Sequence, residues 1–196
     1  MTVQNCVTGL HLTIRHLLDG GLMKRLSLAI ITLLACAGAQ AAIEEKVTMN
    51  LVTSQGVGQA IGTVTIAETA KGLEFSPDLK ALPPGEHGFH VHMNGSCQPA
   101  IKEGKASAAE SAGGHYDPHQ TGKHEGPEGA GHMGDLPLLV VNNDGNATTP
   151  VIAPRLKTLD EVKGKALMIH VGGDNMSDQP KPLGGGGARY ACGVIK

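Results

Sequence analysis

Ile61-Gly62-Thr63-Val64-Thr65-Ile66-Ala67 is a run rich in β-branched residues, and such a run is typical of a β-strand. The preceding stretch Val47-Thr48-Met49-Asn50-Leu51 alternates apolar and polar side chains, as a half-buried strand does. Similar short segments follow at residues 73–75, 86–92, 138–141, 147–153, 166–171 and 191–195. Turn sequences separate them, at residues 54–56, 83–85 and 142–145. Because no segment has the pattern of a long amphipathic helix, the sequence predicts an all-β barrel or sandwich.

The composition agrees with one small domain that has many turns. The chain has 196 residues, only 2% aromatic residues and no Trp, so its core must be built from Val, Ile, Leu, Ala and Met. Its 28 glycines favour tight turns and long loops over a helical bundle. The net charge is -2, and no basic run suited to nucleic acid is present.

The N-terminal segment has the features of an export signal. A short positive stretch, Met23-Lys24-Arg25, precedes the apolar residues 26–37, which are too few to span a bilayer. Ala39-Gln40-Ala41 then provides the small-x-small pattern of a cleavage site. We therefore interpret residues 23–41 as a signal peptide and 42–196 as the functional domain; the alternative is a buried or membrane helix.

Three further expectations concern this end of the chain. A complete signal peptide normally begins at the first Met, so we expect translation to start at Met23 and residues 1–22 to be a spurious extension. Lipidation at Cys36 is a minor alternative, and no stable membrane association is expected. Without residues 1–41 the chain keeps 13 basic and 17 acidic residues, a net charge of -4.

Two cysteines, Cys97 and Cys192, remain after that removal. An even pair in an exported domain predicts a disulfide, and the alternative is two unrelated buried thiols. Closing so long a loop restricts the unfolded chain by about 4–5 kcal/mol in the entropic description.

Two long segments, residues 93–135 and 172–190, are Gly-rich and nearly free of large apolar side chains. Such loops cannot order themselves by hydrophobic burial, and loops of this length are usually functional or disordered. They carry Cys97, four of the histidines and the run Gly184–Gly187. We expect a disulfide and bound metals to order them.

Eight of the ten histidines lie in the domain. His90 and His92 are two apart in a strand, so their rings share one face, and His170 ends another strand. His115, His124, His132 and Asp135 form an array with spacing His-x8-His-x7-His-x2-Asp. Three imidazoles and a carboxylate suit tetrahedral zinc, and three or four imidazoles suit copper. The alternative is a chance scatter of exposed histidines.

Several motifs together resemble the Cu/Zn superoxide dismutases, in particular the bacterial periplasmic branch. The motifs are Gly88-Phe89-His90-Val91-His92, Gly114-His115, Gly131-His132-Met133-Gly134-Asp135 and Gly187-Ala188-Arg189-Tyr190-Ala191-Cys192-Gly193-Val194-Ile195. They occur in family order from about residue 46 onward. The resemblance implies an eight-stranded antiparallel Greek-key barrel or sandwich with two long ordered loops carrying the active site.

The resemblance also implies a role for each site residue. Copper ligands would be His90, His92, His115 and His170, and zinc ligands would be His115, His124, His132 and Asp135. His115 would bridge both metals, and Asp174 would link ligands of the two. His87 corresponds to a structural histidine. His119 has no family role, and we expect it to be exposed.

The implied activity is dismutation of two superoxide radicals to oxygen and hydrogen peroxide by alternate reduction and reoxidation of copper, with structural zinc. His115 would return a proton to the product, and Arg189 would orient the anion. Because the net charge opposes an anionic substrate, we expect a local positive field. Candidates for it are Lys102, Lys105, Lys123 and Lys181.

Two alternatives remain at this point. One is a periplasmic copper/zinc-binding protein without catalysis, and the other is a metal-free structural module. We expect a periplasmic protein with no nucleic-acid partner, and a monomer in preference to the alternative, a homodimer.

Overall fold

The computed structural model describes residues 43–196. The predicted extension at 1–22, the signal peptide at 23–41 and Cys36 lie outside the described residues.

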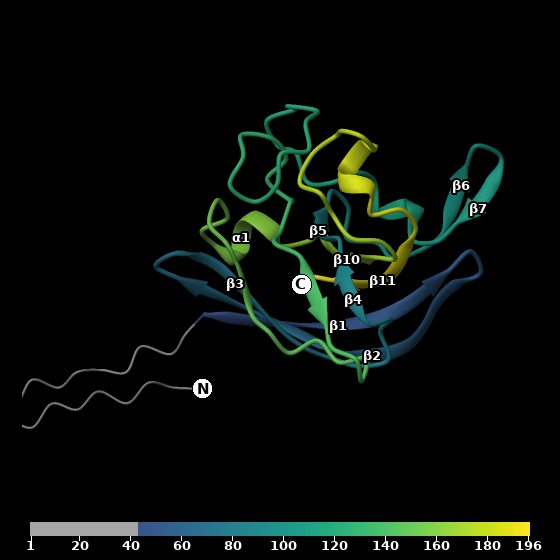
Figure 1. Ribbon diagram of the computed structural model, residues 1–196, viewed down its shortest axis with the longest axis horizontal. Helices are drawn as coiled ribbons and strands as arrows, with labels where there is room; N and C mark the ends of the chain where they lie inside the picture. Colours follow the sequence, from purple (N-terminus) through teal and green to yellow (C-terminus); the bar gives the residue numbers. More distant parts are fainter. Residues whose placement is uncertain (1–42) are drawn as a thin grey trace, which may run out of the picture. The chain divides into compact units, whose positions relative to one another are not determined.

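Seven strands form the main sheet, and every neighbouring pair in it is antiparallel. In spatial order they are β5 (Phe89–His92), β10 (Ala166–His170), β11 (Arg189–Val194), β1 (Glu44–Thr53), β2 (Gly56–Thr69), β3 (Gly72–Leu79) and β9 (Val151–Ala153). The sheet is curled, and in Figure 1 the curved strands β1, β2 and β3 lie beneath β5 and β10. The last strand lies beside the first in the order β11-β1-β2-β3, which is the Greek-key arrangement.

Two shorter pairings complete the strands. β4 (Gly85–His87) pairs with β8 (Leu139–Val141), and β6 (Ala100–Lys102) forms a hairpin with β7 (Lys105–Ser107). The sequence predicted one strand at 86–92, but the structure divides it at Gly88 into β4 and β5. At the break, the N–H of Gly88 donates to Gly172 and its carbonyl accepts from His170. Counted as one interrupted strand, β4 and β5 place β8 at the edge of the main sheet, which gives the eight predicted strands.

The all-β prediction is confirmed. The strand expected at 147–153 begins only at Val151, while Ala147 makes an isolated bridge to Leu79. In the part of the chain that the structure describes, helix is limited to one turn of α1 (Leu159–Val162) and the 3-10 segments η1 (Glu110–Ala112) and η2 (Pro182–Gly185). Within residues 43–196, no helix has the length and apolar character needed to cross a membrane.

The core lies between the curled halves of the sheet and is mostly aliphatic, as the composition predicts, with the addition of both phenylalanines. Phe75 and Phe89 are fully buried, with ring centroids 5.9 Å apart in an edge-to-face arrangement. Met49, Ile66 and Leu167 are fully buried in the same cluster. This burial fixes β5 and β10, the strands that carry His90, His92 and His170.

The two long loops leave the sheet on the same side of the domain, in green and yellow in Figure 1. A disulfide between Cys97 and Cys192 ties the first loop to β11, and the two Cα atoms are 5.7 Å apart. The predicted cysteine pairing is therefore present. Because Arg189 begins the same strand, the disulfide fixes the first loop close to that side chain.

Replacing both cysteines (Cys97→Ser with Cys192→Ser) should lower the free energy of unfolding by about 4 kcal/mol. The reason is that the bridge closes a loop with a sequence separation of 95 residues, which restricts the unfolded chain. Urea denaturation of the oxidised wild type and of the double variant measures the difference. A loss below about 1 kcal/mol would contradict this account of the disulfide.

Candidate metal centre

Two strands and two isolated β-bridges bring the predicted ligands together. β5 carries His90 and His92, the end of β10 carries His170, and isolated bridges attach His115 to His92 and Asp135 to His90. The rings of His90 and His115 stack with centroids 3.9 Å apart. All six histidines and the aspartate of the predicted ligand sets are buried, and none is more than 7% exposed. The structure thus brings residues that are spread over positions 90–170 of the sequence into one cluster.

A first group of possible metal donors consists of His90, His92, His115 and His170, with one nitrogen from each within 4.8 Å of the others. This is the predicted copper set. The Nδ1 atoms of His92 and His170 lie 2.8 and 3.0 Å from the carbonyl oxygens of Gly113 and Gly187, so each donates there. Their Nε2 atoms are 3.4 Å apart. The outer hydrogen bonds therefore aim the inner lone pairs of these two rings at a common point.

A second group surrounds Asp135. Its Oδ1 lies 2.9 Å from Nδ1 of His115 and 3.4 Å from Nδ1 of His132, and its Oδ2 lies 2.9 Å from Nδ1 of His124. These are the four residues of the predicted zinc set. A compact donor group of four forms here with His90 in place of His132. His132 therefore lies beside this group, slightly farther from Asp135 than the other two rings are.

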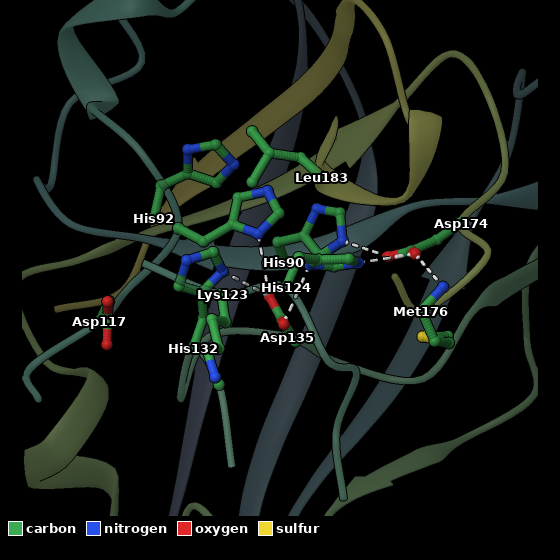
Figure 2. A network of polar contacts seen from close by, with 12 residues as sticks. His90, His92, Asp117, Lys123, His124, His132, Asp135, Asp174, Met176 and Leu183 are labelled. Atoms are coloured by element: carbon green, nitrogen blue, oxygen red, sulfur yellow. Dashed lines mark hydrogen bonds and ion pairs between the residues drawn. The ribbon is translucent and has the colours of Figure 1, made fainter. Parts of the chain in front are cut away.

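Asp174 joins the two groups. Its Oδ2 accepts from Nε2 of His90 at 2.7 Å, and its Oδ1 accepts from Nε2 of His124 at 2.8 Å. Figure 2 shows these two contacts converging on Asp174, with a third from the N–H of Met176. The carboxylate fixes the tautomer and orientation of one ring from each group.

Burial keeps the imidazoles of the first group neutral. Desolvation, followed by repulsion from the other rings, holds the pKa of His90 and His92 well below its ordinary value. The same effect of burial lowers the pKa of His170 to about 4. Neutral imidazoles have the free lone pairs that metal ligation requires.

Neighbouring carboxylates have the opposite effect on His124, because they raise its pKa. Burial lowers the pKa of His124, but its contacts with Asp135 and Asp174 outweigh burial and raise the pKa to about 9. Burial raises the pKa of Asp135, whereas its contacts with His115 and His124 hold it well below its usual range. Asp135 is therefore ionised, and His124 must release a proton to bind a metal. Once it has done so, the second group is a carboxylate among imidazoles, which is the donor set that suits zinc.

Unpaired polar atoms provide an independent test of whether metals fit these residues. Among the described residues, the buried side-chain atoms without a hydrogen bond are His90 Nδ1, His124 Nδ1, His132 Nδ1 and Asp135 Oδ2. Two of them, His124 Nδ1 and Asp135 Oδ2, face each other at 2.9 Å as an ion pair without hydrogen-bond geometry. Buried polar atoms are normally paired, and leaving one unpaired costs about 1–3 kcal/mol. All four belong to the two donor groups, so bound metals would satisfy them. The residues present fit the predicted metals.

Arg189 is placed beside the first group. Its Nη1 donates to the carbonyl of Ala109 at 2.6 Å, and its Nη2 donates to the carbonyl of Gly113. The same Gly113 oxygen accepts from His92, so one carbonyl positions both side chains. Glu110 Oε2 lies 3.3 Å from Nη1 of Arg189, whose side chain is 11% exposed. Burial lowers the pKa of Arg189 and Glu110 opposes this, so the guanidinium stays cationic.

The remaining predicted residues are also placed. His87 is buried, with Nδ1 2.8 Å from the His170 carbonyl oxygen and Nε2 2.8 Å from that of Pro83, in a structural position. His119 is exposed, as expected. The four candidate lysines are all exposed, and Lys102 lies 3.5 Å from Glu110.

Sequence reasoning missed three residues that support the site. Arg155 donates to the carbonyls of Gly131 and His132, Glu110 contacts Arg189, and Asp178 accepts from the N–H of His124. Arg155 and Asp178 bind backbone groups of the first loop, and Glu110 contacts a side chain from a distant part of the sequence. No spacing in the sequence indicates such contacts.

Comparisons with known proteins agree with this geometry. Residues 60–195 match the family model described as copper/zinc superoxide dismutase. A superoxide dismutase [Cu-Zn] of Escherichia coli K12 is 82% identical over 174 residues, which cover 89% of this chain and 100% of that protein.

Two solved structures are also similar. The Cu/Zn superoxide dismutase from Brucella abortus has a TM-score of 0.78 and 55% identity, covering 79% of this chain and 100% of that one. The solution structure of the monomeric copper, zinc superoxide dismutase from Salmonella enterica has a TM-score of 0.72 and 80% identity, with the same coverage. The fold, the donor groups and these similarities lead to one conclusion: this chain belongs to the copper/zinc superoxide dismutase family.

Proposed function

We propose that this protein is a superoxide dismutase that converts two superoxide radicals and two protons to oxygen and hydrogen peroxide. The observation that carries the proposal is that His115 belongs to both donor groups while Arg189 lies beside the first. A protein that only stores or delivers metal has no need for a buried cation next to its copper ligands. The arginine therefore favours the enzyme over a non-catalytic metal-binding protein.

The copper site would consist of His90 Nδ1, Nε2 of His92 and His170, and His115. In His90 the other nitrogen is bonded to Asp174, which leaves only Nδ1 free. In His115, Nδ1 faces Asp135, so Nε2 is the atom directed at the copper set. Copper bound there supplies the one-electron chemistry, by cycling between its two oxidation states.

Zinc would be held by His115, His124, His132 and Asp135. Both His90 and His132 lie near this group, and the choice between them follows from their hydrogen bonds. His90 already donates to Asp174 through Nε2 and has its free Nδ1 for copper. His132 has an unpaired buried Nδ1 at 3.4 Å from Asp135, and zinc gives that atom a partner.

The side chains of this protein would divide the work of the reaction between them. Arg189 offers a fixed positive charge beside the copper set, where it attracts and orients the superoxide anion. His115, shared between the groups, can hold a proton on Nε2 and pass it to the product. Burial of the other rings excludes water from the copper ligands, so their lone pairs stay unprotonated.

We also propose that the protein works in the periplasm as a monomer. Support for export comes from the signal-like pattern at residues 23–41. Support for a monomer comes from the Salmonella enterica relative, which is described as monomeric and is 80% identical.

Replacing the shared histidine (His115→Ala) should remove copper, zinc and activity together, because one ring serves both donor groups. Metal content of the purified variant, measured by atomic spectrometry, checks this. His119→Ala is the matched control, since His119 is an exposed histidine of the same loop and should leave both metals in place. Retention of a full equivalent of either metal by the His115 variant would contradict the shared-ligand assignment.

Removing the guiding charge (Arg189→Gln) should lower kcat/KM for superoxide by about tenfold or more, while both metals remain bound. The dependence of the rate on ionic strength should also become weaker, because part of the attraction is screened by salt. Lys71→Gln makes the same change in net charge at an exposed position outside the long loops, and it should have little effect. Equal effects of the two substitutions would show that Arg189 contributes only net charge.

A further inference from the structure

Asp178 lies four residues after Asp174 in the second long loop, and its carboxylate connects two segments far apart in the sequence. Its Oδ2 accepts the backbone N–H of His124 at 2.9 Å, and its Oδ1 accepts the backbone N–H of Leu183 at 3.1 Å. The carboxylate therefore joins the first long loop, at His124, to the turn at Leu183 in the second.

The peptide group between Lys123 and His124 is held from both sides. Its carbonyl oxygen, on Lys123, accepts the N–H of His132 at 2.9 Å, and its N–H, on His124, donates to Asp178. This one peptide group thus connects two histidines of the second donor group. Asp178 fixes its N–H side, so it constrains the position of the His124 backbone while Asp174 constrains the ring.

The second contact of Asp178 holds the chain that covers this site. Leu183 has φ of +53°, a left-handed conformation that is unfavourable for a non-glycine residue. Gly184, which follows, lies against the Asp174–His124 hydrogen bond so closely that a β-carbon there would overlap the Asp174 carboxylate. The bond from Leu183 to Asp178 helps to keep this strained turn in place over the Asp174–His124 pair.

We propose that Asp178 is a positioning residue for zinc, a second carboxylate that acts on the backbone of His124 as Asp174 acts on its ring. This inference rests on the zinc site proposed above. The copper set is bonded to Gly113, Gly187 and Asp174, and the base of the second loop is closed by bonds from Val171 to Ala188 and from Gly172 to Gly186. Loss of Asp178 therefore acts on zinc and spares copper.

The first test is the rate of zinc release to a coloured chelator from metal-loaded protein. Asp178→Ala removes both acceptors and should speed release by about tenfold or more, the usual effect of losing a residue that orients a metal ligand. Asp178→Asn keeps one acceptor oxygen and should fall between the wild type and the Ala variant. Copper retention should change by less than about threefold in both variants.

Asp117→Ala is the matched control. Asp117 also accepts a backbone N–H, from Gly122 at 2.8 Å, but its bonds stay within the first loop. Figure 2 shows it lying apart from the contacts of Asp135 and Asp174. Its removal should change zinc release by less than about threefold. Equal zinc release from the Asp117 and Asp178 variants, or equal loss of copper and zinc from the latter, overturns the proposal.

A second measurement does not depend on metal. The amide protons of His124 and Leu183 should exchange slowly with solvent in the wild type and at least tenfold faster in Asp178→Ala, as measured by NMR. Unchanged exchange rates at both amides would refute the proposal that Asp178 holds these two backbone groups. If the wild type binds no zinc, the proposed zinc site fails, and the exchange rates still decide whether Asp178 joins the two loops.

Discussion

The pair of hydrogen bonds from His90 and His124 to Asp174 is the interaction on which the metal centre depends. His90 comes from a strand in the rigid sheet, His124 from the first long loop and Asp174 from the second. All three side chains are fully buried, so their mutual hydrogen bonds are not weakened by competing water. One carboxylate thereby sets the ring orientation in both donor groups and attaches both loops to the sheet.

Order in the loops follows from a few polar contacts, since they contain little apolar surface. Arg155 holds two carbonyls of the first loop, the disulfide attaches that loop to β11, and Asp178 joins it to the second. The same disulfide places η1 where its neighbouring carbonyls can accept from Arg189. The stability of the fold and the position of Arg189 thus depend on the same covalent bond, while the sheet itself is stabilised by its separate apolar core.

Much of this arrangement could be predicted from the sequence, because periodicity and family motifs report on it directly. Alternation located His90 and His92 on one strand face, and the cysteine pair predicted the bridge. The spacing and types of the loop residues indicated a zinc-like set with Asp135, and the family motifs assigned each ligand to its metal. The break at Gly88 was missed because it depends on backbone bonds to a distant segment. Asp178 was missed for a similar reason: its partners are backbone N–H groups that any residue type supplies.

The central claim is that this cluster holds copper and zinc and turns over superoxide. The most direct measurement is superoxide consumption by the purified protein, with copper and zinc determined on the same sample before and after chelation. The account predicts one copper and one zinc per chain with rapid consumption, loss of activity when the metals are removed, and recovery when both are restored. Full occupancy by both metals without superoxide consumption would contradict it.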